Sequence, residues 1–476
     1  MAHGRTADAV RVAQQNPRTF RALLIVGYAA FVGLALASVL VLGIQALAMP
    51  LVVAVVVYFG ATSMRAAAFL LLFLPFLVSY LEFNPPWRVY PGYLAVVILA
   101  VAWVRERRAA PERVRVPRRD LALFAGFAAM VWLSWAFGDW RTSVPVAQIR
   151  ALGVTTRFCL ASVVALLVVP ALSDRGRVRT FMWVVLATAL VPTYSLFFIH
   201  TGQVDDPNLL IERASGLFAH GPHTAGVYEL FYLLTSLGLV VTEHDRVRRL
   251  WLSIATGVFF VALILTGSRT VLISLVVIGV AALFTIGRAV WRRIGLVHVY
   301  FLIVAVVVTM LAAAPIVKIT PGTGVYQILT TGRMALVRFG LGLAASHPFL
   351  GVGFGIHDFY LAEQPAIAQF GLNIHTYYVS ILVETGVPGF LLFLTLIGSV
   401  VVHFIRAAAE FRAQGDTEME VAANAFLLSF VGILFMFLTQ AGIGIRLFWL
   451  LVGVAVALRG VARRGSAPGA VSDALQ

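Results

Sequence analysis

The sequence predicts an all-α fold, a polytopic bundle of about 12–14 membrane-spanning helices, and three observations lead to it. Hydrophobic residues make up 61% of the 476 residues. Charged residues make up only 12%, whereas a soluble protein carries about 25% and needs them to cover its surface. Apolar runs of about 20 residues, the length of one membrane crossing, recur between short charged segments. An ordinary soluble enzyme is therefore excluded.

The apolar runs follow one another with short polar connections. The predicted spans are 22–58 (two helices), 66–81, 89–104, 121–137, 152–172, 180–199, 224–241, 251–265, 271–286, 296–314, 389–405, 421–439 and 447–458. Residues 1–21 and 459–476 are predicted to be cytoplasmic tails, and residues 22–458 a single membrane domain. The interval 315–374 is predicted to be a long segment outside the membrane, and loops of that length commonly carry function.

The basic residues favour one orientation of this bundle. When the spans alternate from a cytoplasmic N-terminus, 26 of the 36 cationic residues fall in inner segments, as the positive-inside rule requires. The segments 200–223, 266–270 and 315–374 then lie on the extracytoplasmic face. Ten cationic residues lack this topological explanation: Arg88, Arg141, Arg150, Arg157, Arg213, Arg269, Lys318, Arg333, Arg338 and Arg446.

Two of these arginines lie in turns at the predicted outer face. Arg269 lies in Leu265-Thr-Gly-Ser-Arg-Thr-Val-Leu272, with Ser268 beside it. Arg213 lies in Glu212-Arg-Ala-Ser-Gly-Leu-Phe218, before the span that begins near residue 224. A guanidinium at the membrane boundary should face water, protein or an anionic ligand, and its planar fork suits phosphate. The alternatives are that Arg269 extends to the lipid interface and that Arg213 is a solvent-exposed residue paired with Glu212.

A glycine-rich segment and a histidine follow. His347-Pro-Phe-Leu-Gly-Val-Gly-Phe-Gly355 has three glycines at alternate positions, which a phosphate cradle or, more ordinarily, a tight turn with close packing would explain. His375 is predicted to begin a helix that runs to Glu384 and ends at Gly386 and Pro388. A histidine there can accept a proton near neutral pH, or it can simply pack at the membrane interface.

The order of these segments resembles the O-antigen ligase/polymerase superfamily. The resemblance covers about residues 207–394 and rests on Arg213-Ala-Ser-Gly-Leu-Phe, Gly-Ser-Arg269, Gly332-Arg333 before the glycine segment, and His375 with Glu384-Thr-Gly-Val-Pro-Gly389. The family commonly has Asn after the histidine, where this chain has Thr376, and a Pro-Asn pair where it has Gly221-Pro-His223. The resemblance implies a GT-C-like bundle in the bacterial inner membrane, with its active site on the extracytoplasmic face.

The resemblance also implies a reaction. A glycan would pass from a polyprenyl diphosphate carrier to a hydroxyl group of a glycan or lipid-core acceptor, with inversion and without a metal or other cofactor. Membrane lipids are the other expected partners, and nucleic acid is not expected. The residues implied for the donor diphosphate are Arg213, Arg269, Arg333 and Ser268; for catalysis His375, with Glu384 as the weaker candidate; and for loop contacts Gly351, Gly353 and His223.

Two other classes of membrane protein stay open at this stage. A flippase or exporter of lipid-linked glycans would also use arginines, but along a path through both leaflets, whereas the candidates here gather on one face. A solute transporter would favour repeated halves, and the sequence shows no internal repeat. Within the resemblance, the sequence does not distinguish a polymerase from a ligase.

Overall fold

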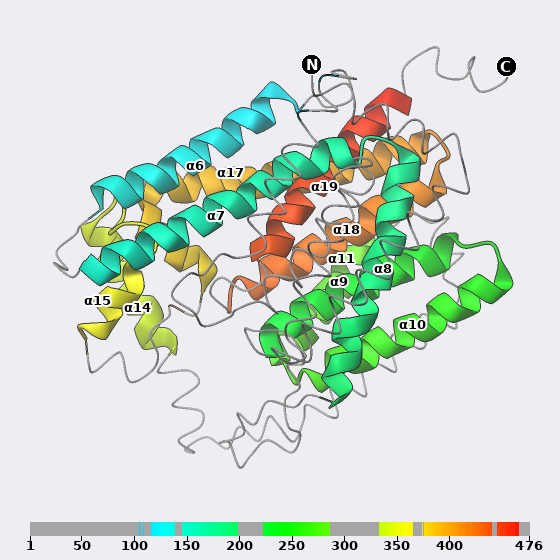
Figure 1. Ribbon diagram of the computed structural model, residues 1–476, viewed down its shortest axis with the longest axis horizontal. Coiled ribbons are helices and arrows are strands. Elements are labelled where there is room, and N and C mark those ends of the chain that lie inside the picture. The colour runs from blue at the N-terminus through cyan, green and yellow to red at the C-terminus, as the bar shows by residue number, and fades with distance from the viewer. Residues whose placement is uncertain are drawn as a thin grey trace, which may run out of the picture.

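In a computed structural model of the chain, the described residues are 104, 108, 116–138, 145–198, 222–285, 333–364, 374, 376–439 and 445–465. These residues form helices and no strand, and the helices lie side by side in an elongated bundle (Figure 1). Six of the described helices are long and apolar enough to cross a membrane. The predicted all-α, multi-pass membrane fold is therefore confirmed.

Most of the predicted spans in this part of the chain coincide with helices. The elements in chain order are α6 (Arg118–Phe137), α7 (Pro145–Ala171), α8 (Arg175–Phe198), α9 (Pro222–Thr242), α10 (Arg246–Leu265), α11 (Arg269–Thr285), α14 (Arg333–Ser346), α15 (His357–Ala362), α17 (Tyr377–Ala413), α18 (Thr417–Met436) and α19 (Ile445–Gly465). The spans predicted before residue 104 and at 296–314 lie outside the described residues.

Helix α17 differs from its prediction at both ends. It begins at Tyr377 and not at residue 375, because Thr376 has an extended backbone with φ −142° and ψ 122°. It also continues past Gly386, although that residue interrupts the helix with φ 68° and ψ −174°. A glycine tolerates this conformation, and Pro388 suits the first turn of the helix that resumes. The predicted helix end is thus a kink, and the predicted span 389–405 is the second part of the same element.

The interval 315–374 contains regular structure where the sequence suggested a long loop. In its described part, α14 is an apolar helix and α15 a single short turn of helix. Helix α14 packs on α17: at Gly340 an added Cβ atom would come within 2.9 Å of side-chain atoms of both Ile374 and Val379. This segment is therefore docked on the bundle.

The centre of the bundle is formed by α9 and α18. In the most apolar 18 residues of each helix, 89% of the residues of α9 and 83% of those of α18 are buried. The corresponding share for α10, which lies at the periphery, is 22%. Aromatic rings join α18 to its neighbours: Phe430 stacks on Phe448 of α19 at 5.5 Å, and Phe448 lies 5.8 Å from Phe393 of α17. Lipid tails are as apolar as these side chains, so close van der Waals packing is what holds such helices together.

The helices alternate in direction, so the bundle has two distinct ends. At one end of the bundle lie the first residues of α6, α8, α10 and α18 and the last residues of α7, α9, α11, α17 and α19. We call it the arginine-rich end, because its segments 118–120, 173–179, 242–249, 406–420 and 459–465 hold most of the described arginines. The opposite end contains residues 347–357, and we call it the glycine-loop end.

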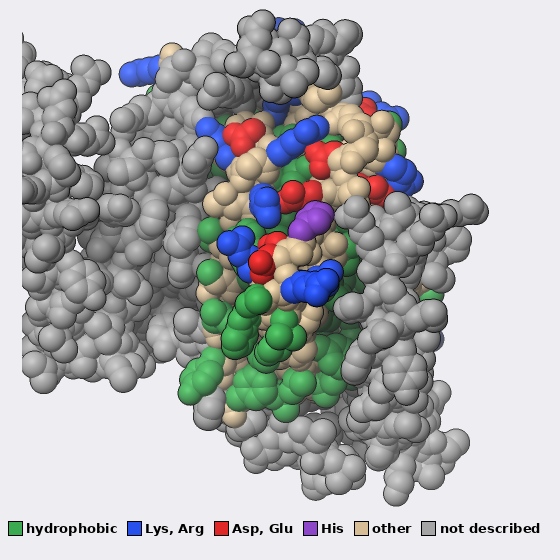
Figure 2. Space-filling view, turned by 90° about the vertical axis from the view of Figure 1, so that its right-hand side faces the viewer, with side chains coloured by type: hydrophobic (Ala, Val, Ile, Leu, Met, Phe, Trp, Pro, Cys, Tyr) green, Lys and Arg blue, Asp and Glu red, His purple; other side chains and the backbone are tan. Residues whose placement is uncertain are grey.

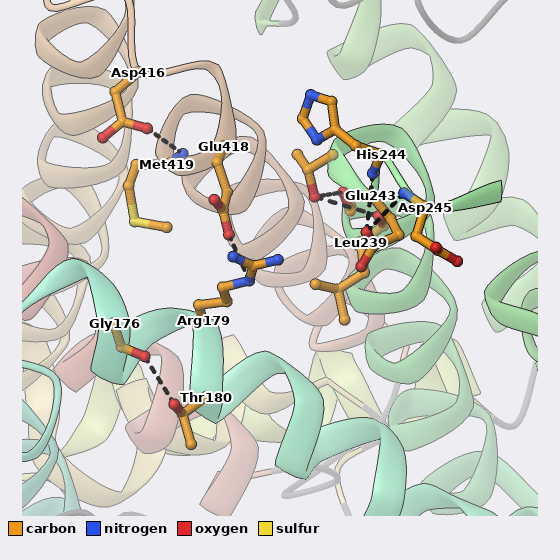
Figure 3. Close-up of polar contacts among 12 residues, drawn as sticks. Gly176, Arg179, Thr180, Leu239, Glu243, His244, Asp245, Asp416, Glu418 and Met419 are labelled. Carbon is orange, nitrogen blue, oxygen red and sulfur yellow. Dashed lines mark hydrogen bonds and ion pairs between the residues drawn. The ribbon is translucent and has the colours of Figure 1, made fainter. Parts of the chain in front are cut away.

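Ion pairs and helix caps order the arginine-rich end. Figure 2 views this side of the molecule, where basic and acidic side chains intermingle above a hydrophobic area. Arg179 Nε lies 3.2 Å from Glu418 Oε1, which joins α8 to α18 (Figure 3). Asp416 Oδ1 accepts a hydrogen bond from the Met419 N–H at 3.1 Å and so caps α18. The charged groups in these contacts therefore join or cap helices.

Candidate functional site

The glycine segment packs against three helices at the glycine-loop end. Gly351, Gly353 and Gly355 all have positive φ, at 69°, 116° and 79°, a conformation that side chains with a Cβ atom disfavour. A Cβ atom on Gly351 would clash with the backbone of Glu384, and one on Gly353 would lie 3.3 Å from the Cα atom of Gly138. These glycines therefore let the loop approach other backbones closely.

The N–H groups of this loop point to protein acceptors. The Gly351 N–H donates to the His347 carbonyl at 3.1 Å, and the Val352 N–H to the Val383 carbonyl at 2.9 Å. The Gly355 N–H donates to the Glu384 carboxylate at 2.9 Å. A phosphate cradle needs such groups to face the ligand, so the arrangement favours the packing explanation for Gly351 and Gly353.

Glu384 is the residue to which the loop is attached. Its side chain is buried, and Oε1 accepts hydrogen bonds from Gly355 N–H and from His357 Nδ1, the latter at 2.7 Å. The Ser134 hydroxyl of α6 donates to the Glu384 main-chain carbonyl. Glu384 therefore ties α17, the glycine loop and the start of α15 together.

A second polar cluster lies where α9 and α11 begin. His223 Nδ1 lies 2.8 Å from Ser268 Oγ, so the structure brings together two residues singled out from the sequence. Ser268 is buried in the turn between α10 and α11, where Gly267 has a φ of 58°. The same turn is followed directly by Arg269, the first residue of α11.

The end of α18 connects this turn to the start of α17. Thr439 Oγ1 donates to Thr270 Oγ1 at 3.1 Å. Two residues earlier, the Phe437 carbonyl accepts the Tyr377 N–H at 2.8 Å and the Thr376 hydroxyl at 3.4 Å. The backbone of Arg269 and the residues next to position 375 therefore lie around one helix end.

Each of these two polar clusters includes residues from a segment of the chain that a family model recognises. Residues 254–394 match the Wzy_C family model, described as O-antigen ligase. The segment is similar to an O-antigen ligase domain. It contains the Ser268–Arg269 turn, the glycine loop and Glu384, and it confirms the resemblance predicted from the motifs. A comparison with curated proteins finds no match.

The predicted site residues of the O-antigen ligase domain differ in how far the structure describes them. Ser268, Gly351, Gly353 and Glu384 are described in full. Arg269 and Arg333 are placed by their backbones, as the first residues of α11 and α14, and their side chains lie outside the description. Arg213, which precedes the matched segment, and His375 lie outside the described residues. The roles predicted for these residues stay predictions.

His357 is the polar residue at this end that the sequence analysis missed. It follows the last glycine of the loop by two positions, and it contacts Glu384, which lies 27 residues further along the chain. A histidine two residues beyond an alternating glycine segment was the available signal. Among the described residues, no group of three or more His, Cys, Asp or Glu side chains is arranged to hold a metal ion.

Proposed function

We propose that this chain is a membrane glycosyltransferase that moves a glycan from a polyprenyl diphosphate carrier to an acceptor hydroxyl group on the extracytoplasmic side of the bacterial inner membrane. The O-antigen ligase domain implies glycosyl transfer and lipid-linked glycan substrates at the level of the family. The observation that carries the proposal is the convergence of the 266–270 turn and of Thr376 and Tyr377 at the end of α18.

The proposed chemistry is a direct, inverting displacement. The acceptor oxygen attacks the anomeric carbon, the bond from that carbon to the phosphate oxygen breaks, and the polyprenyl diphosphate leaves with the bonding electrons. His375 accepts the proton of the acceptor hydroxyl. Arg213, Arg269 and Arg333 stabilise the charge that develops on the leaving diphosphate. Because guanidinium groups supply this charge, the scheme requires no metal ion.

The proposed side of the membrane follows from the two ends of the bundle. The positive-inside rule assigns the arginine-rich end to the cytoplasm. The glycine-loop end, with Ser268, His223 and the neighbours of His375, then faces outward. The lipid-linked donor would lie in the outer leaflet with its diphosphate at the level of these residues.

We propose that Glu384 and His223 act by positioning. Glu384 holds the glycine loop against α17 through Gly355 and His357, and His223 holds the turn that precedes Arg269 through Ser268. These contacts support a role in which both residues hold the reacting groups in fixed positions. Enzymes gain rate from such preorganisation.

The test is a reaction of the purified full chain, in lipid vesicles, with a polyprenyl diphosphate-linked glycan. Transfer predicts a product in which a new glycosidic bond joins the donor glycan to an acceptor, together with free polyprenyl diphosphate. Movement of the donor between leaflets without a new bond would identify a flippase and contradict the proposal. In cells that lack the protein, loss of long glycan ladders would indicate a polymerase, and ladders left on the carrier lipid a ligase.

A further inference from the structure

Arg446 is an arginine at the glycine-loop end to which no role has been assigned. It lies in the first turn of α19 and is half-buried. Two residues later, the Phe448 ring lies 5.5 Å from the Phe437 ring. Phe437 in turn packs on Tyr377 at 4.6 Å and accepts the Tyr377 N–H. The start of α19 therefore adjoins the end of α18 and the residues that follow position 375.

A longer-range interaction relates Arg446 to α9. Its guanidinium lies within electrostatic range of the Tyr228 hydroxyl group. Tyr228 is buried on α9, five residues after His223. The start of α19 thus adjoins the end of α18, which is also joined to Tyr377 through Phe437 and to Thr270 through Thr439.

The groups gathered here are mostly hydrogen-bond donors. The described polar groups around this helix end are His223, Ser268, Thr270, Thr439 and Arg446, and none of these five is acidic. The buried Glu229, which follows Tyr228 on α9, accepts a hydrogen bond from the Thr193 hydroxyl of α8 at 2.9 Å. Hydroxyl and imidazole groups with a guanidinium form a site that suits an anion with several acceptor oxygens, and in apolar surroundings each such interaction is stronger than in water. A diphosphate has this character.

We propose that Arg446 is a further donor-binding residue, whose guanidinium contacts the carrier diphosphate from the α19 side, opposite His223 and Ser268. This inference rests on the proposed function, because the ligand is the diphosphate of its lipid-linked donor. Arg446 binds the donor and does not take part in proton transfer. Its loss therefore acts on donor affinity before it acts on the rate of the chemical step.

The experiment measures binding of two probes, polyprenyl diphosphate and polyprenyl monophosphate, to the full chain in lipid nanodiscs. We expect Arg446→Ala to weaken diphosphate binding roughly tenfold to a hundredfold, the range of one charge-assisted hydrogen-bonded contact. Monophosphate binding should fall less, because a single phosphate can stay with the remaining donors. Arg446→Lys should recover part of the loss, since it keeps the charge without the planar fork.

Two further variants make the result decisive. Arg338→Ala removes an exposed arginine of α14 and should bind both probes like the wild type. Tyr228→Phe removes only the hydroxyl group near Arg446 and should weaken diphosphate binding by a smaller factor. If Arg446→Ala does not fold, as judged by its thermal unfolding, Arg446→Lys and Tyr228→Phe carry the test.

The outcomes separate this inference from the proposed function. Wild-type diphosphate affinity in Arg446→Ala, with a loss in Arg269→Ala, would overturn the inference and leave the function standing. Equal losses of both probes in Arg446→Ala would show a general lipid-interface contact, which also contradicts the inference. A wild-type protein that binds diphosphate no better than monophosphate would overturn the proposed function and the inference with it.

Discussion

The two ends of the bundle use charged residues differently. At the arginine-rich end, arginines form short ion pairs with carboxylates: Arg175 Nε lies 3.0 Å from Asp416 Oδ2, and Arg412 Nε lies 2.8 Å from Glu420 Oε1. At the glycine-loop end the described polar contacts join hydroxyl, imidazole, carboxylate and backbone groups. Arginines at this end are found at helix starts, as Arg269, Arg333 and Arg446 are.

This difference distinguishes arginines that set the orientation in the membrane from arginines that are proposed to bind the substrate. Paired arginines at the arginine-rich end satisfy the positive-inside rule and lock helix ends together, and exposed pairs of this kind contribute about 0.2–1 kcal/mol each. The positive-inside rule does not account for arginines at the other end, and the proposed reaction needs positive charge there. If the comparison is right, matched substitutions at the two ends should give very different results.

The largest effect is expected for His375. His375→Ala should reduce the single-turnover rate of transfer by about 10²–10⁴-fold while the donor still binds, because the base acts only when an acceptor is present. His375→Gln keeps an amide contact but cannot accept the proton, so it should be equally slow. Wild-type turnover by His375→Gln would remove the base assignment, and loss of donor binding would move His375 to the diphosphate site.

The next effect is expected for Arg269. Arg269→Ala and Arg213→Ala should each lower transfer roughly tenfold to a hundredfold or more, the effect of losing about 1.5–3 kcal/mol from a charged contact. Arg269→Lys should rescue poorly, because it lacks the bidentate fork. Arg179→Ala, which removes a paired arginine at the opposite end, is the matched control. Full activity in Arg269→Ala would leave that residue with an interfacial role only.

A smaller effect on activity and a clear one on stability are expected for Glu384. Glu384→Ala leaves the Gly355 N–H and His357 without their acceptor, which costs about 1–3 kcal/mol. The thermal unfolding midpoint should fall, whereas Glu363→Ala, at an exposed residue after α15, should leave it unchanged. A loss of transfer above about 10²-fold in Glu384→Gln, with unaltered unfolding, would instead indicate a chemical role.

The smallest effect is expected at the arginine-rich end itself. Arg179 and Glu418 side chains are 49% and 38% exposed, so Arg179→Ala should change the free energy of unfolding by less than about 1 kcal/mol. Thermal unfolding and transfer activity of the purified variant measure this. A loss of transfer comparable to that of Arg269→Ala would erase the distinction between the two ends.

The sequence was sufficient for the helices and insufficient for the contacts between them. Apolar runs predicted α7, α9 and α18 because each span must bury about 20 residues. The start of α17 was wrong by two residues, because the Thr376 hydroxyl and the Tyr377 N–H bind the end of α18, a contact that only tertiary structure creates. The kink at Gly386 is likewise set by the Val387 N–H, which donates to the Pro348 carbonyl at 2.7 Å.

The same limit applies to the candidate site. The motifs singled out Ser268, His223 and Glu384, since polar and acidic residues stand out in apolar chains, and the structure shows each of them in a polar contact. Periodicity could not reveal that Glu384 binds His357 or that the start of α19 packs on the end of α18, because these partners come from different elements of the bundle. The apolar helix α14 was missed because Arg338, Gly340 and Gly342 interrupt its apolar run.

The central claim is that the glycine-loop end faces the extracytoplasmic side, where the donor reacts. Single cysteines placed at Phe349, which is 76% exposed, and at the exposed Arg246 of the arginine-rich end test it in a Cys159→Ser background. Intact spheroplasts are treated with a membrane-impermeant maleimide. The account predicts labelling of Phe349→Cys and protection of Arg246→Cys until the membrane is opened. Labelling of Arg246→Cys with protection of Phe349→Cys would contradict it.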